Sequence, residues 1–111
     1  MTAEPRPLPH HLIGLKPPFT LSEARKMLRY VRGIVRDMVA GHSNKSLVDK
    51  CEDELLRFGI TVADRKVGRI HFPTYAQGML ADYCWTPEED VIGLWHPILK
   101  CGSERWPVGS E

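Results

Sequence analysis

The chain has no long hydrophobic run, few cysteines and no marked excess of charge of either sign. No apolar run approaches the roughly 18 residues that cross a bilayer, so we expect neither a membrane span nor a signal peptide. The three cysteines, Cys51, Cys84 and Cys101, are an odd number without CxxC spacing. This argues against a disulfide scaffold and for a reducing, cytoplasmic location. The glycines are scattered singly, so no Gly-rich phosphate loop is predicted.

Size and proline content predict the domain organisation. At 111 residues the chain has the length of one small domain. Five prolines fall within the first 18 residues, where they remove backbone donors and favour extended geometry. We therefore predict a flexible proline-rich arm at residues 1–18 and a single folded domain at residues 19–108.

Two amphipathic patterns follow the arm. Thr20 and Glu23 form a capping box, and apolar residues then recur every three or four positions as far as Gly41, which predicts a helix. We expect Gly41 to end this helix in left-handed geometry. A second stripe begins near Val48 and stops at Gly59. Because the connection between the stripes is short, we predict an antiparallel helical hairpin.

Beyond residue 60 the apolar period changes from helical to two. Alternation at residues 69–72, 80–85 and 91–96 predicts three strands, with turns at residues 73–78 and 87–90. The predicted fold class is therefore α+β, with the antiparallel helical hairpin packed on one face of a three-stranded antiparallel β-meander.

Imidazole, carboxylate and thiol groups meet in the predicted meander, and the candidate site comprises His71, Asp82, Cys84 and His96. Pairing Ile70 with Tyr83, and Tyr83 with Trp95, puts an aromatic row on the core face. The same register places both histidines and the aspartate in one row on the other face, with the cysteine two residues beyond. Such a row can bind zinc or a similar transition metal, or act as an acid–base pair.

A structural role is the competing interpretation of the same residues. In it, Asp82 accepts a hydrogen bond from one of the histidines, and Cys84 is a small buried hydrophobe. Regular pairing sets Cys84 and His96 about 7 Å apart along the strands, which strains their binding to one ion. A slip of one residue in either hairpin also removes Asp82 or His96 from the row. No ligand spacing or nucleophile–base motif stands out, so we expect no bound cofactor.

The second and third predicted strands are apolar on both sides, whereas two helices can cover only one face. The other face therefore needs a cover, either the tails or a second subunit, and the expected contact residues are Ile92 and Leu94. This favours a non-enzymatic protein-interaction module that forms a homodimer or docks on a larger protein. The alternative is a small metal-dependent or acid–base enzyme that uses the histidine, aspartate and cysteine cluster.

A basic stripe lies opposite the apolar face of the first predicted helix and consists of Arg25, Arg29, Arg32 and Arg36. Such a stripe can grip phosphates. However, the formal net charge is only +1, and no aromatic residues are interleaved among the arginines, so the usual nucleic-acid footprint is missing. We interpret the stripe as a solvated face complemented by acidic residues of the second helix, and we expect no nucleic-acid partner.

Several short motifs occur in a characteristic order: Phe19-Thr-Leu-Ser-Glu-Ala-Arg, Gly59, His71-Phe72-Pro73, Cys84-Trp85, Gly93-Leu94-Trp95-His96 and Arg105-Trp106-Pro107-Val108. Together they resemble the bacterial family catalogued as domain of unknown function 2203, over about residues 19–108. The resemblance implies the fold and a bacterial origin, and it implies no reaction. The chain departs from the family pattern at Met79, where a basic residue is usual, and at Pro97, where an acidic one is usual.

Overall fold

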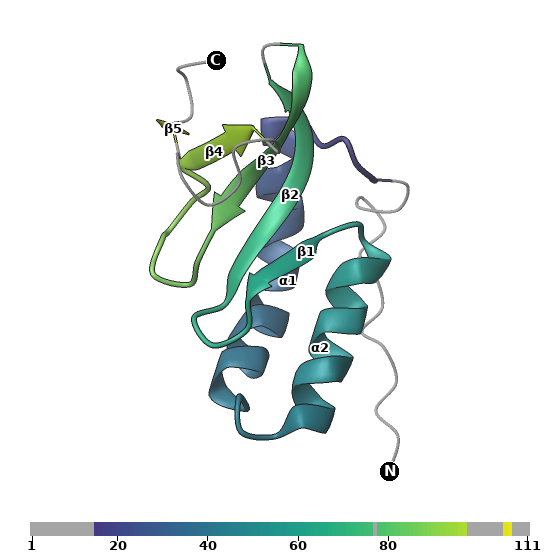
Figure 1. Cartoon of the computed structure of the whole chain (residues 1–111), viewed down its shortest axis with the longest axis vertical. Helices are drawn as coiled ribbons and strands as arrows, with labels where there is room; N and C mark the ends of the chain where they lie inside the picture. The colour runs from purple at the N-terminus through teal and green to yellow at the C-terminus, as the bar shows by residue number, and fades with distance from the viewer. Residues whose placement is uncertain (1–14, 77, 98–105, 108–111) are drawn as a thin grey trace.

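The computed structural model describes residues 15–76, 78–97 and 106–107, so residues 1–14 of the predicted arm and Cys101 lie outside the described part. The elements are α1 (Leu21–Ala40), α2 (Lys45–Arg57), β1 (Thr61–Asp64), β2 (Arg69–Ala76), β3 (Met79–Trp85), β4 (Leu94–Pro97) and β5 (Trp106–Pro107). The strands form one antiparallel sheet in the order β1-β2-β3-β4-β5 (Figure 1). The predicted α+β fold class is confirmed. The sheet has two short edge strands, β1 and β5, beyond the three predicted.

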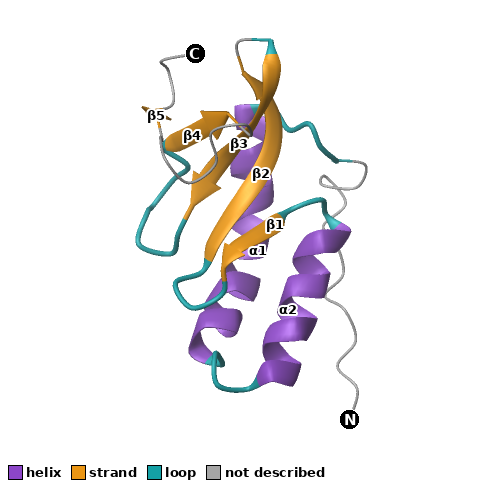
Figure 2. Cartoon of the chain, in the orientation of Figure 1, coloured by secondary structure: helices purple, strands orange, loops and turns teal. Residues whose placement is uncertain are grey.

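The two helices form the predicted hairpin, and both lie on one side of the sheet (Figure 2). The Thr20 hydroxyl accepts a hydrogen bond from the Glu23 amide at 3.1 Å, and the Glu23 carboxylate accepts one from the Thr20 amide at 2.9 Å, as the capping box predicts. Asn44 caps α2 by accepting from the amide three residues ahead. Gly41 ends α1 at a φ of −99°, so the expected left-handed geometry is not adopted there. Neither helix of the described part is both long and apolar enough to cross a membrane.

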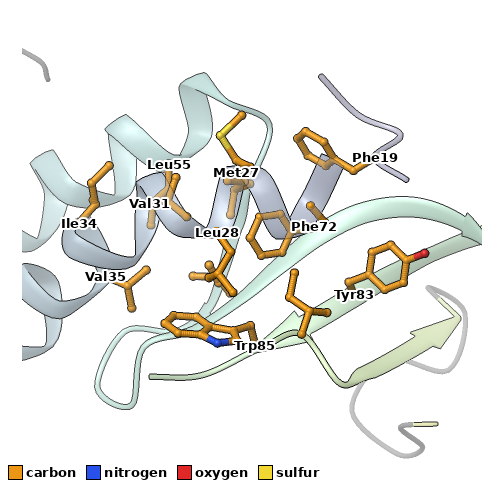
Figure 3. Packing of buried hydrophobic residues seen from close by; sticks show 14 of the residues in the cluster. Phe19, Met27, Leu28, Val31, Ile34, Val35, Leu55, Phe72, Tyr83 and Trp85 are labelled. Carbon is orange, nitrogen blue, oxygen red and sulfur yellow. The ribbon is translucent and has the colours of Figure 1, made fainter. Parts of the chain in front are cut away.

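The core lies between the hairpin and the inner face of the sheet, which is the face turned toward the helices (Figure 3). The helices contribute the buried residues Ala24, Met27, Leu28, Val31, Ile34, Val35, Met38, Val48, Cys51 and Leu55. The sheet contributes Ile70, Phe72, Tyr83, Trp85 and Trp95. The aromatic row predicted for the core face is therefore confirmed. We call the opposite side of the sheet the outer face.

The hairpin that joins β2 to β3 is longer and tighter than predicted. β2 runs through Pro73 to Ala76, which pairs with Met79. Gly78, just before Met79, has a positive φ of 74°, which is common in short hairpin turns. The predicted turn at residues 73–78 is therefore wrong, because Pro73 lies beyond the end of the β1 ladder, at a strand edge where proline is tolerated. The Phe19 amide donates to the Pro73 carbonyl at 2.8 Å along that edge.

The longer hairpin changes one of the two predicted registers. Phe72, and not Ile70, lies opposite Tyr83, so the predicted β2–β3 register is wrong by two residues. The predicted pairing of Tyr83 with Trp95 is confirmed. Since side chains alternate between faces with a period of two, an even shift leaves every side chain on its predicted face.

Arginines of α1 hold the connection between β3 and β4. Arg25 donates to the carbonyl of Ile92 at 3.3 Å, and Arg32 donates to the carbonyl of Asp90. The Arg32 guanidinium also lies 5.7 Å from the ring centroid of Trp85, within reach of a cation–π contact. Two acidic residues of α2 pair with an arginine in the β1–β2 turn instead. Arg25 is exposed and Arg32 is half-buried, so the stripe is in contact with solvent as predicted and also holds the β3–β4 connection. Its expected pairing with acidic residues of α2 is not formed in the part of the chain that the structure describes.

Ile92 lies in the core and not at an interface. Its side chain is fully buried, whereas that of its neighbour Val91 is 58% exposed. The prediction is wrong because β4 begins only at Leu94, so the strand alternation expected from residue 91 does not apply to Ile92. The side chain of Leu94, the second expected contact residue, lies outside the described part of the structure.

Candidate metal centre

Three neighbouring strands bring the four candidate side chains together on the outer face. His71 comes from β2, Asp82 and Cys84 from β3, and His96 from β4, and these strands lie side by side (Figure 1). His71 pairs with Cys84, and Asp82 pairs with His96. Because paired residues, and residues two apart on a strand, share a face, all four side chains project to the same side.

All four residues are buried within the single chain. The exposed fractions are 8% for His71, 9% for Asp82, 3% for Cys84 and 1% for His96. Burying polar groups costs free energy unless their atoms find partners. A second subunit is therefore not needed to cover this part of the outer face, which removes one reason for predicting a dimer.

The thiol and the two imidazoles are close enough to share one ion. One ligand atom from each of His71, Cys84 and His96 lies within 4.8 Å of the other two. Cys84 Sγ is 2.8 Å from His96 Nδ1, and the two imidazole centroids are 4.8 Å apart. Donors bound to one tetrahedral zinc ion lie roughly 3.3–3.7 Å from each other, given usual bond lengths. Small side-chain adjustments therefore place all three donors around an ion.

The contact between Cys84 and His96 contradicts the predicted strain. Leu94 is the residue opposite Cys84, so Cys84 and His96 are diagonal neighbours. Diagonal neighbours on adjacent strands are about 7–8 Å apart at the backbone, within reach of long side chains that lean toward each other. The prediction considered the backbone spacing and left out the length of the imidazole arm.

Asp82 lies between the two histidines. Its Oδ2 is 3.6 Å from His71 Nδ1 and 3.7 Å from His96 Nε2, and both distances exceed hydrogen-bond length. The hydrogen bond expected between Asp82 and a histidine is therefore not formed. Burial raises the pKa of Asp82 from its ordinary value of 3.8 to about 6, because the carboxylate loses hydration.

The Asp82 carboxylate lies near one nitrogen of each histidine ring. Asp82 faces Nδ1 of His71 and Nε2 of His96, and the other nitrogen of His96, Nδ1, adjoins the thiol. Metal-binding histidines commonly direct their second nitrogen toward a carboxylate, which fixes the ring. One thiolate and two imidazoles can hold zinc with a fourth position open. A thiol in contact with an imidazole also suits a nucleophile–base pair.

Residues 42–108 of the chain match the family described as uncharacterized conserved protein (DUF2203). The chain belongs to this family. The matched DUF2203 region begins later than the expected residue 19, and it contains all five strands and all four residues of the cluster. Comparisons with curated proteins and with solved structures found no match.

Sequence reasoning missed one residue of the DUF2203 region that lies beside the cluster. Arg69 precedes His71 by two positions on β2, so it also faces outward. Its buried Nε has no hydrogen-bond partner among the described residues. Arg69 follows the same period-two alternation that placed the other four residues on one face, so this pattern was the signal that could have identified it.

Proposed function

We propose that this DUF2203 protein binds a zinc ion, or a similar transition metal ion, through His71, Cys84 and His96. The observation that carries the proposal is the convergence of three buried ligand atoms, from three strands, within 4.8 Å of one another. A thiol is a weak hydrogen-bonding group, so a cluster built only for hydrogen bonds gains little from a cysteine. Thiolate and imidazole are, in contrast, preferred zinc ligands.

Among the residues that the structure describes, the number of converging donors favours a reactive metal over a purely structural one. Structural zinc sites usually have four protein ligands, whereas catalytic sites have three and keep one position for water or substrate. Asp82 lies outside the three-donor set and faces one nitrogen of each ring, which suits an orienting role. We therefore propose a small metal-dependent enzyme. We also propose a bacterial cytoplasmic setting, whose reducing conditions keep Cys84 a thiol.

Metal analysis of protein purified without chelator tests this function. We expect close to one zinc or similar ion per chain, and we expect Cys84→Ala and His96→Ala each to lose it. Cys51→Ala is a matched control, because Cys51 is a second buried cysteine that forms no disulfide, on α2. His42→Ala is the control for an exposed histidine. Wild-type protein that holds no stoichiometric metal, even after incubation with Zn²⁺ and desalting, would refute the proposal.

A homodimer-forming interaction module is the second candidate function. The observation that favours it is an apolar pair at the tip of the β2–β3 hairpin, where Tyr75 lies opposite Leu80 on the outer face. Their exposed fractions are 57% and 53%. A second copy that placed the same pair against this one would bury both through a two-fold contact. Light scattering is expected to show a dimer that Leu80→Ser converts to a monomer, and a monomeric wild type would exclude this candidate.

A further inference from the structure

We infer that the cavity beside Cys84 binds a small ligand through an anionic group, a carboxylate or a phosphate, and that Arg69 recognises this group. The inference rests on the proposed metal site, because Cys84 lines the cavity and also belongs to the cluster. The cavity has a volume of about 360 Å³. Small-molecule pockets are typically about 300–1,000 Å³, so the space suits a small metabolite.

The cavity continues the row of metal ligands along the strands. Arg69 lies two residues before His71, and Thr86 lies two residues after Cys84, just beyond the last pair of the β2–β3 ladder. Arg69, Cys84 and Thr86 all line the cavity. A ligand held there therefore lies against both Arg69 and Cys84.

Arg69 lacks an acceptor that a ligand can supply. Its Nε is buried and makes no hydrogen bond to any described residue, and no ion pair joins it to a carboxylate in that part of the chain. A buried donor on a charged group is costly when it has no acceptor. The planar guanidinium offers paired N–H donors that match the oxygens of a carboxylate or a phosphate. An anionic group bound at the Arg69 side of the cavity, away from the Glu88 and Glu89 carboxylates that also line it, meets this requirement.

The loop that lines the cavity with Thr86 and Glu89 is held in place by hydrogen bonds within the chain. Glu89 Oε2 accepts from the Thr86 amide at 2.8 Å, and the Glu89 carbonyl accepts from Trp85 Nε1 at 2.9 Å. One oxygen of the Glu89 carboxylate, Oε2, therefore already has a hydrogen-bond donor. Arg32 binds the carbonyl of the next residue, Asp90, which anchors the same loop to α1. A preformed wall lowers the ordering cost of binding a ligand.

Titration of the cobalt-substituted protein with inorganic phosphate tests the site. The visible absorption of thiolate-bound Co²⁺ is expected to change saturably with phosphate. Arg69→Gln should still bind one cobalt ion per chain while its phosphate affinity falls at least about tenfold, because a charge-assisted contact is lost. Arg65→Gln, which removes an arginine already paired with Asp49 and Glu52, is the matched control and should titrate like wild type. Acetate in the same titration separates carboxylate from phosphate recognition.

Failure of the anion site and failure of the metal site give different results. If wild type binds cobalt but neither anion changes its spectrum or its thermal midpoint, the anion site is refuted and the metal site stands. If wild type binds no cobalt, the metal site is refuted. The anion site is then tested by the change in thermal midpoint that the anion causes. A shift that is lost in Arg69→Gln and kept in Arg65→Gln supports the anion site, and an equal shift in all three proteins refutes it. Should Arg69→Gln not fold, Arg69→Lys makes the same comparison, since it keeps the charge but not the planar fork.

Discussion

Cys84 Sγ lies 2.8 Å from His96 Nδ1, although strand pairing puts Leu94 opposite Cys84. The contact links β3 to β4 diagonally, so the side chains reinforce a junction that the backbone ladder makes over only four pairs. A thiol and an imidazole at this distance share either a proton or an ion. If they share an ion, its removal must weaken the attachment of β4.

Metal removal is expected to lower the thermal midpoint of the wild-type protein. An ion that binds only the native state stabilises it by RT ln(1 + [L]/Kd), about 2.7 kcal/mol when the free ion is at 100 times Kd. Calorimetry with and without a chelator measures the effect. Cys84→Ser should unfold at the same temperature in both conditions, whereas Cys51→Ser should respond to chelator as wild type does. An unchanged wild-type midpoint would contradict an ion in the native state.

Asp82 is expected to make the metal-free protein less stable as the pH rises from about 4 to about 6. The ordinary pKa of an aspartate is 3.8, and the pKa of Asp82 in the folded protein is about 6. Between these two pH values the folded state therefore binds more protons than the unfolded state. The contribution of Asp82 to stability is then largest below the lower of the two pKa values, and it is lost as the carboxylate ionises with rising pH. This rise in the pKa of Asp82 corresponds to at most about 3 kcal/mol of stability.

Denaturant unfolding of chelated wild type and Asp82→Asn across this range measures the effect. The variant should be the more stable protein at pH 7, and the difference should shrink toward pH 4. Both proteins contain His71 and His96, so the difference between them reports on the carboxylate. A difference that stays constant with pH would show that the folded protein does not raise the pKa of Asp82.

Leu28→Ala is expected to lower the free energy of unfolding by about 2–5 kcal/mol, because a large side chain leaves a cavity in a packed core. Leu28 is 2% exposed and sits among core residues of α1 and the sheet. Leu56→Ala on α2 is the matched control, since Leu56 is 50% exposed, and its effect should stay within about 0.5 kcal/mol. Similar losses in the two variants would show that the helices do not pack in this way.

Nucleic acid is expected to bind weakly or not at all at physiological salt. Arg25 and Arg32 donate to backbone carbonyls of the β3–β4 connection, so part of the donor set of each guanidinium is already used. Fluorescence anisotropy with labelled DNA and RNA measures the affinity. Submicromolar binding that Arg29→Glu abolishes would overturn this expectation.

Local sequence patterns were enough to predict the helical hairpin, its first cap and the faces of the strands. The Thr20–Glu23 capping box and the apolar stripes act within one or two turns of chain, so they do not depend on the rest of the fold. The grouping of His71, Asp82, Cys84 and His96 on one face followed from the two-residue period. This grouping remained correct although the predicted β2–β3 register was wrong, because the register was shifted by an even number of residues.

The sequence by itself determined which side chains share a face, and the tertiary structure decided which of them touch. Whether Pro73 ends a strand depends on whether another strand pairs there, and β1 has already stopped. Ile92 is buried because the connection before β4 turns it into the core, a path fixed partly by the hydrogen bond from Arg25 on α1. The cavity beside Arg69 lies between segments that are distant along the chain. Periodicity reports only on neighbours in sequence, whereas these features arise from contacts between elements that fold together.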